Sequence, residues 1–124
     1  VSKNISQITS GKYDSIILEE DLKLFVWENG KKIPVGQLSR GTLEQAYLAM
    51  RMAVGSILIQ EEPMPVLLDE TFSMYDDKRL ADTLTWLLKR QEQIIMFTCQ
   101  KRELEVLERM NVSCNKIILD EGAL

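Results

Sequence analysis

The chain has 124 residues, with 15 Lys and Arg against 19 Asp and Glu, so its formal net charge is −4, and it contains no histidine. The missing imidazole excludes Ser-His-Asp and Cys-His nucleophile relays, HExxH zinc sites and a histidine pH switch within this chain. The mild acidity argues against broad nucleic-acid binding by this segment alone, because phosphate contacts need clustered Lys and Arg. Any chemistry therefore rests on carboxylates, hydroxyls, backbone amides and cations.

Length and composition predict one globular domain. Chains of about 100 to 200 residues usually form a single core, and 45% hydrophobic with 27% charged residues is an ordinary globular composition. Cys99 and Cys114 form no CxxC pair, so we expect two reduced, buried thiols in a cytoplasmic protein. No apolar run reaches the roughly 18 to 20 residues of a membrane span, and no basic-then-apolar leader opens the chain. The first residue is Val1, which suggests a segment excised from a longer protein.

The first 35 residues divide into a polar start and three short strand-like runs. Residues 1–12 are polar and end in a Ser-Gly-Lys turn composition, so we interpret them as the end of an upstream coiled-coil helix or a linker. Asn29-Gly30 predicts a tight hairpin, because both central positions of such a turn take positive φ. Alternating apolar runs predict strands over residues 15–18, 22–27 and 32–35.

Helices and strands alternate in the rest of the chain. The apolar run Met64–Leu68 predicts a strand buried in the middle of a sheet. This alternation indicates an α/β fold, a parallel sheet with covering helices, preceded by a small antiparallel β-hairpin region. A long helix is predicted to bury Leu43, Ala46, Tyr47, Met50, Ala53, Val54, Ile57 and Leu58. After the apolar strand come a helix over about 77–90, a strand over 93–98, a helix near 101–110 and a last strand over 116–119.

Two adjacent carboxylates, Asp69 and Glu70, follow the buried strand. In open α/β sheets, ligands bind at the carboxyl ends of the strands. An Asp there can hold the hydration shell of Mg²⁺, and the next residue can orient or deprotonate an attacking water. The alternative, which a bare Asp-Glu pair favours, is a solvated acidic turn.

A second signal, Leu38-Ser39-Arg40-Gly41-Thr42, lies just before the long helix, 69 − 41 = 28 residues upstream of Asp69 when counted from Gly41. A serine and a glycine there put a hydroxyl and free backbone N–H groups at the positive end of the helix dipole, which favours phosphate binding. A helix-capping serine in a flexible turn is the alternative. The two motifs together, with a helix and a strand between them, are more specific than either alone.

These motifs resemble those of a known family. The string LSRGT resembles the signature motif of ABC-type ATPases, Val66–Glu70 resembles their Walker B motif, and Ser73–Asp76 stands where their D-loop follows. The longer string LSRGTLEQAYLAMRMA is most similar to the SMC-like branch, with its YhaN-like and SbcC-like ATPases of DNA repair and chromosome maintenance. Residues 13–124 would then be the carboxy-terminal lobe of a P-loop NTPase head. The amino-terminal lobe, with the Walker A loop, would lie across a coiled coil.

The resemblance implies a role for each matching residue. Asp69 would support Mg²⁺, and Glu70 would be the catalytic base or water-positioning group. The signature would contact the γ-phosphate of ATP held by the opposite head of a head-to-head dimer; for Arg40 a solvated side chain is an equal alternative. Ser73 and Asp76 of the D-loop would cross the dimer interface. The nucleotide-binding set is Ser39, Arg40, Gly41 and Thr42.

The sequence departs from the family pattern at three places. No GxxxxGK followed by Ser or Thr is present, so there is no phosphate-cradling loop, and we expect this fragment alone to bind ATP poorly and to be inactive. The D-loop lacks the proline that is usual in transporters. Where the family places a phosphate-contacting histidine, this chain has Gln100, or Cys99 if the register shifts by one. A glutamine there would position rather than titrate, or would merely begin a helix.

The preferred hypothesis is the signature and Walker B half of an SMC-like ABC ATPase that acts in DNA repair or chromosome transactions. It implies ATP and Mg²⁺ in the complete head only. Its partners would be the missing amino-terminal lobe, a second head in a homodimer, DNA and a nuclease. The alternatives are a non-catalytic ABC-like dimerisation or interaction module, and a stand-alone α/β domain with a chance Asp-Glu pair. Surface exposed by the missing lobe predicts self-association.

Overall fold

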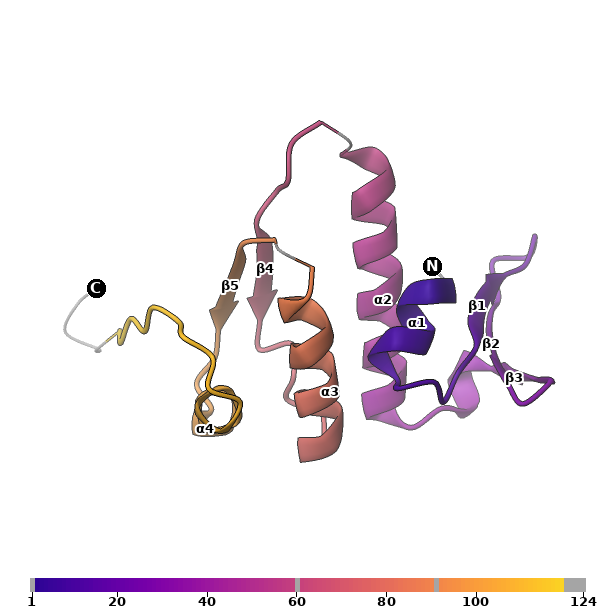
Figure 1. The fold of residues 1–124 in the computed structure, drawn as a ribbon. Coiled ribbons are helices and arrows are strands. Elements are labelled where there is room, and N and C mark those ends of the chain that lie inside the picture. The colour runs from indigo at the N-terminus through magenta and orange to yellow at the C-terminus, as the bar shows by residue number, and fades with distance from the viewer. Residues whose placement is uncertain (1, 60, 91, 120–124) are drawn as a thin grey trace.

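The computed structural model describes residues 2–59, 61–90 and 92–119. They form a mixed α/β fold with a three-stranded antiparallel sheet and a two-stranded parallel sheet. Figure 1 shows the antiparallel sheet at one end, then the helices α1, α2 and α3, then the parallel sheet, with the segment that follows α4 at the opposite end. The elements are α1 (Ser2–Ile8), β1 (Ser15–Leu18), β2 (Leu24–Glu28), β3 (Lys31–Pro34), the short 3-10 helix η1 (Val35–Gln37), α2 (Arg40–Leu58), β4 (Val66–Asp69), α3 (Asp77–Leu88), β5 (Ile94–Phe97) and α4 (Lys101–Arg109). None of the helices described is both long enough and apolar enough to cross a membrane.

The antiparallel sheet has the order β1-β2-β3 and contains the predicted hairpin. Asn29 and Gly30 take φ values of 50° and 76°, which confirms the turn between β2 and β3. Val26 at the centre of β2 is fully buried and attaches this sheet to the core. The strand β2 begins at Leu24 rather than two residues earlier, because Leu22 has a φ of 62° and belongs to the preceding turn.

The helix α1 packs into the core although its sequence is polar. Ile5 and Ile8 are fully buried. The side chain of Gln45 in α2 donates a hydrogen bond to the Ile8 carbonyl at 3.1 Å, and Asn4 donates to the Ala49 carbonyl at 3.3 Å. These contacts fix α1 against α2 by apolar burial and by side-chain bonds to backbone. The interpretation of residues 1–12 as the end of an upstream helix or linker stays a prediction.

The buried face of α2 differs from the predicted one. Tyr47, Val54, Ile57 and Leu58 are exposed, so the predicted apolar stripe is wrong over much of its length. The reason is close packing: neighbouring elements approach α2 where its side chains are small, or where a polar group such as Gln45 finds partners. Its amide also donates to the Thr83 hydroxyl of α3 at 3.1 Å. The residues actually buried are Gly41, Thr42, Gln45, Ala46, Leu48, Ala49, Met52 and Ala53.

Within the described part of the chain, β4 pairs only with β5, in parallel, with Leu67 opposite Ile95. Leu68 is 1% exposed and belongs to the core cluster that includes Leu80 of α3, whereas Leu67 is 59% exposed. The prediction of a strand buried in the middle of a helix-covered sheet is therefore wrong for the described residues. The described residues give β4 one neighbouring strand and cover one of its two faces. β4 therefore has the apolar composition of a strand buried on both faces, although one face is exposed to solvent.

The strand predicted over residues 116–119 is not formed. These residues are irregular, and Ile117, Ile118 and Leu119 are all exposed. A strand exists only through pairing with a neighbour, and none lies beside this segment in the described part of the chain. Its apolar side chains are left in solvent.

Candidate functional site

Glu70 directly follows β4 in a left-handed backbone conformation with a φ of 46°, which is uncommon for a residue other than glycine. Its N–H donates to the Phe97 carbonyl at 2.9 Å, and its Oε1 accepts from the Cys99 N–H at 2.5 Å. The backbone turn therefore aims the carboxylate at the segment that follows β5. Strained backbone of this kind is concentrated at functional sites, where neighbouring bonds hold it in place.

Asp69 lies on the uncovered face of the parallel sheet, opposite Phe97 of β5. Within the described ranges its carboxylate takes part in no hydrogen bond or ion pair. Mg²⁺ is commonly held by one or two carboxylates together with water and substrate phosphates, so Asp69 suits that ion. No group of three or more His, Cys, Asp or Glu that could hold a metal occurs in the described residues, so phosphate oxygens would have to complete the set.

Residues 38–42, called the signature turn below, are built on a helix cap. Ser39 is the N-cap of α2, and its Oγ accepts a hydrogen bond from the Thr42 N–H at 3.3 Å and lies 2.9 Å from the Thr42 hydroxyl. This confirms the capping role. Ser39 and Arg40 are exposed, while Thr42 is 2% exposed. The serine hydroxyl and the arginine are thus the parts of the turn that a ligand could reach.

Gly41 is required by the packing of this turn. A Cβ at this position would lie 2.9 Å from the Met74 carbonyl oxygen and 3.1 Å from Cδ of Arg79. The first distance is shorter than real Cβ contacts, and its partner is backbone that cannot rotate away. The signature turn and the D-loop segment, residues 71–76, are therefore in direct contact.

The D-loop segment is fixed from α4 by Arg102. Its Nη1 donates to the Tyr75 carbonyl at 2.5 Å and its Nη2 to the Phe72 carbonyl at 2.6 Å. The rings of Phe72 and Tyr75 are buried and meet edge to face at 5.3 Å. Burial raises the pKa of the Tyr75 phenol, so this group stays neutral at any ordinary pH. Ser73 is exposed at the tip of the segment.

Asp76 closes the D-loop segment and begins α3 as its N-cap. Its Oδ1 accepts from the Arg79 N–H at 2.8 Å, and its Oδ2 forms an ion pair with Nη1 of the same arginine. The other terminal nitrogen of Arg79, Nη2, donates to the Thr42 hydroxyl at 3.1 Å and to the Ser39 hydroxyl at 3.4 Å. One guanidinium thus joins the signature turn to the end of the D-loop segment.

The segment after β5 brings Cys99, rather than the side chain of Gln100, against Glu70. Gln100 is the N-cap of α4 without a side-chain capping bond, and its N–H donates to the Thr98 hydroxyl at 3.0 Å. The hydrogen bond and the charge of Glu70 raise the pKa of the Cys99 thiol. Cys99 and Cys114 are both exposed, so the expectation of buried thiols is wrong. Cys99 occupies a turn at the sheet edge, which no helix of the described chain covers.

The contact between Cys99 and Glu70 predicts slow alkylation of this thiol. Because the thiolate reacts and Glu70 disfavours it, a Cys114→Ser chain is expected to react slowly with iodoacetamide at pH 8. Adding Glu70→Gln removes the negative charge, lowers the pKa of the thiol and is expected to speed the reaction several-fold. The measurement is the alkylation rate by mass spectrometry between pH 7 and 10. Equal rates with Glu and Gln at position 70 would show that the two side chains do not interact in solution.

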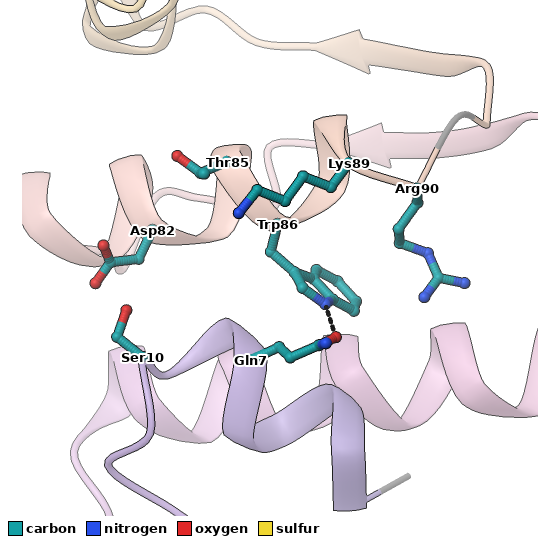
Figure 2. A pocket seen from close by; sticks show the side chains of 7 residues that line it. All are labelled: Gln7, Ser10, Asp82, Thr85, Trp86, Lys89 and Arg90. Atoms are coloured by element: carbon teal, nitrogen blue, oxygen red, sulfur yellow. Dashed lines mark hydrogen bonds between the residues drawn. The ribbon is translucent and has the colours of Figure 1, made fainter.

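An open pocket of about 370 Å³ lies between α1 and α3, and none of the predicted site residues lines it. Figure 2 shows the Trp86 Nε1–H donating to the Gln7 side-chain oxygen, at 3.2 Å. The Arg90 guanidinium lies 5.1 Å from the centre of the Trp86 ring and forms an ion pair with Glu92. These polar groups largely satisfy one another and hold α1 on α3. The pocket is lined by Gln7, Ser10, Asp82, Thr85, Trp86, Lys89 and Arg90.

The predicted site residues therefore fall into two groups. Glu70 contacts the segment after β5 and Asp69 lies beside it, opposite Phe97, while Arg79 joins the signature turn to Asp76. Sequence reasoning missed Arg79 and Arg102, which hold these segments together. The spacing of three residues between Asp76 and Arg79 could have indicated their ion pair, because residues at this spacing lie on one helix face. The hydrogen bonds from Arg102 to backbone carbonyl groups follow no sequence pattern.

The fold matches part of solved SMC ATPase head structures. A structure from work on ATP-driven dimerisation and DNA-stimulated activation of SMC ATPases aligns with a TM-score of 0.64 and 20% identity over 85% of this chain and 70% of that one. The SMC head domain of Pyrococcus furiosus, with an extended coiled coil and bound to the C-terminal domain of ScpA, aligns with a TM-score of 0.61 and 19% identity, over 85% of this chain and 28% of that one.

Sequence comparison identifies particular relatives. The chain is 33% identical over 99 residues to the uncharacterised protein YhaN of Bacillus subtilis. This alignment covers 76% of this chain and 10% of YhaN. It is 35% identical over 101 residues to the DNA double-strand break repair Rad50 ATPase of Pyrococcus abyssi, covering 77% of this chain and 11% of that protein. No family model matches the chain.

The chain is thus partly homologous to YhaN and to the Rad50 ATPases, and its fold matches part of an SMC head. A third relative, the Rad50 ATPase of Archaeoglobus fulgidus, is 30% identical over 105 residues, which are 77% of this chain and 12% of that protein. The chain spans about a tenth of the length of these curated relatives.

Proposed function

We propose that this chain is the signature and Walker B half of an SMC-like ABC ATPase head, which hydrolyses ATP as a head-to-head dimer and serves DNA repair or chromosome transactions. The observation that carries the proposal is the pair of carboxylates at the end of β4. Glu70 is held in a left-handed conformation with its Oε1 fixed by the Cys99 N–H, and Asp69 is exposed on the uncovered face of the sheet. This arrangement supports different roles for the two adjacent carboxylates: Glu70 would activate water, and Asp69 would bind Mg²⁺.

The chain's own groups can perform part of the hydrolysis of a phosphate anhydride. Glu70, with one oxygen occupied by the Cys99 amide, keeps the other oxygen available to orient a water and take its proton. Asp69 would hold Mg²⁺, which neutralises charge on the phosphates when bound. Ser39 and the N-terminus of α2 offer a hydroxyl and N–H groups to phosphate oxygens supplied by an opposite head.

The same proposal includes partners that the chain does not contain. An amino-terminal lobe would cover the open face of the parallel sheet, where Leu67, Ile95 and Phe97 are exposed. The relation to Rad50 double-strand break repair ATPases supports DNA as a ligand of the complete protein and leaves room for a nuclease partner. The work on ATP-driven dimerisation of SMC ATPases supports a second head as the partner of the signature turn.

The test compares the isolated chain with a complete head, in which an amino-terminal lobe carrying Walker A is joined to this chain. Calorimetry is expected to detect no micromolar ATP binding by the isolated chain, whereas the complete head is expected to bind ATP with Mg²⁺, dimerise and release phosphate. Micromolar ATP affinity of the isolated chain would contradict the proposal that the ATP site is divided between this chain and the amino-terminal lobe. A complete head that dimerises with ATP but never releases phosphate would favour the non-catalytic dimerisation module, an alternative that the absence of histidine supports.

A further inference from the structure

Arg79 joins two segments that lie far apart in the sequence. Its Nη1 pairs with the carboxylate of Asp76, and its Nη2 donates to the hydroxyls of Thr42 and Ser39, which are 37 and 40 residues away. The side chain is 29% exposed, so its cationic end is reachable from solvent beside the signature turn. A planar guanidinium can bond on two edges at once, which a lysine ammonium cannot do with the same geometry.

The bonds of Arg79 are not needed to form either segment. Asp76 caps α3 through the backbone N–H of residue 79, which any residue except proline supplies. Ser39 caps α2 through the Thr42 N–H, and the two hydroxyls contact each other at 2.9 Å. Removing the guanidinium therefore leaves both helix caps intact. What is lost is the hydrogen-bonded connection between them, while the backbone contact of Gly41 with Met74 remains.

We propose that Arg79 is a positioning residue that couples the signature turn to the D-loop segment. The inference rests on the proposed function, because it assigns the coupling to phosphate held at Ser39. Phosphate oxygens there attract the guanidinium, whose bond to Ser39 Oγ is its longest at 3.4 Å. Asp76 is ion-paired to the same guanidinium and moves with it. Binding of phosphate at the signature turn thereby shifts the D-loop segment as well.

The first experiment needs no ATP and uses the chain itself. Hydrogen exchange measured by mass spectrometry is expected to speed up in both residues 38–43 and residues 71–77 in Arg79→Lys and Arg79→Gln, at an unchanged melting temperature. The control is Lys78→Gln, which removes only an exposed ion pair with Asp82. Faster exchange confined to residues 76–80, or no change, overturns the coupling.

The second experiment uses the complete head. Arg79→Gln is expected to lower kcat by about 10- to 100-fold while KM for ATP changes little, since misplacement of a catalytic arrangement by about 1 Å has effects of that size. Arg79→Lys is expected to rescue little of the rate, because charge without the forked geometry does not restore both contacts. An unchanged kcat in Arg79→Gln overturns the proposal. A wild-type head without hydrolysis defeats the proposed function, and the exchange experiment then decides the coupling alone.

Discussion

Glu70→Gln in the complete head is expected to lower the rate of ATP hydrolysis by about 10²- to 10⁴-fold, the contribution typical of a general base, while ATP binding and dimerisation persist. The glutamine keeps a carbonyl oxygen where Glu70 Oε1 accepts the Cys99 N–H, so the turn after β5 retains its bond. Only the charge and the proton affinity are lost. Phosphate release measures the rate, and size-exclusion chromatography with ATP measures the trapped dimer.

Glu70→Ala is the matched comparison, because it removes the base and the acceptor of the Cys99 bond together. It is expected to be as inactive as the glutamine variant but to loosen the turn, seen as faster hydrogen exchange over residues 98–101. A glutamine variant that hydrolyses ATP at the wild-type rate would remove Glu70 from its catalytic role. The chain would then depend on another group to activate water.

The second large effect is expected on the open face of the parallel sheet. Leu67 and Phe97 are 59% and 50% exposed there, and burial of the exposed half of such side chains stabilises an association by about 0.8 to 1.7 kcal/mol each. Leu67→Gln combined with Phe97→Gln is therefore expected to weaken binding of the amino-terminal lobe by about 10- to 200-fold. The same change is expected to reduce self-association of the isolated chain.

Calorimetry with the separate lobe and a concentration series by analytical ultracentrifugation measure the two effects. Leu22→Gln serves as the control, since this leucine is 79% exposed in a turn of the antiparallel sheet. Unchanged lobe affinity in the double variant, or an equal loss in the control, would show that the open face is not the docking surface. A chain that is monomeric at every concentration would contradict self-association.

The sequence predicted those structural features that depend on residues close to one another in the chain. The Asn29-Gly30 turn depends on two adjacent residues that tolerate positive φ, and the Ser39 cap on a hydroxyl within three residues of its partner. The order of strands and helices from β1 to α4 followed from periodicity in the same way. For residues 1–12 a helix end and a linker stayed open as alternatives, because Ile5 and Ile8 are the two apolar residues of α1 and give a weak pattern.

Features that depend on distant partners could not be predicted. The buried face of α2 is decided by α1 and α3, not by the size of its own apolar residues, and Gln45 is buried because Thr83 and the Ile8 carbonyl accept its amide. The apolar segment over residues 116–119 has the composition of a strand but no neighbour among the described residues. Likewise, Arg102 reaches carbonyl groups 27 and 30 residues away, and backbone carbonyls carry no sequence signal.

The close approach of Gly41 to the Met74 carbonyl has a consequence for association. Two loops that would otherwise be ordered only on meeting a partner are already locked together when the chain folds, with Arg102 holding the second loop from behind. The conformational entropy of these loops is then lost in folding rather than in binding. A surface of this kind meets its partner as a rigid body, so the affinity of two such heads depends mainly on the groups they present and little on loop rearrangement.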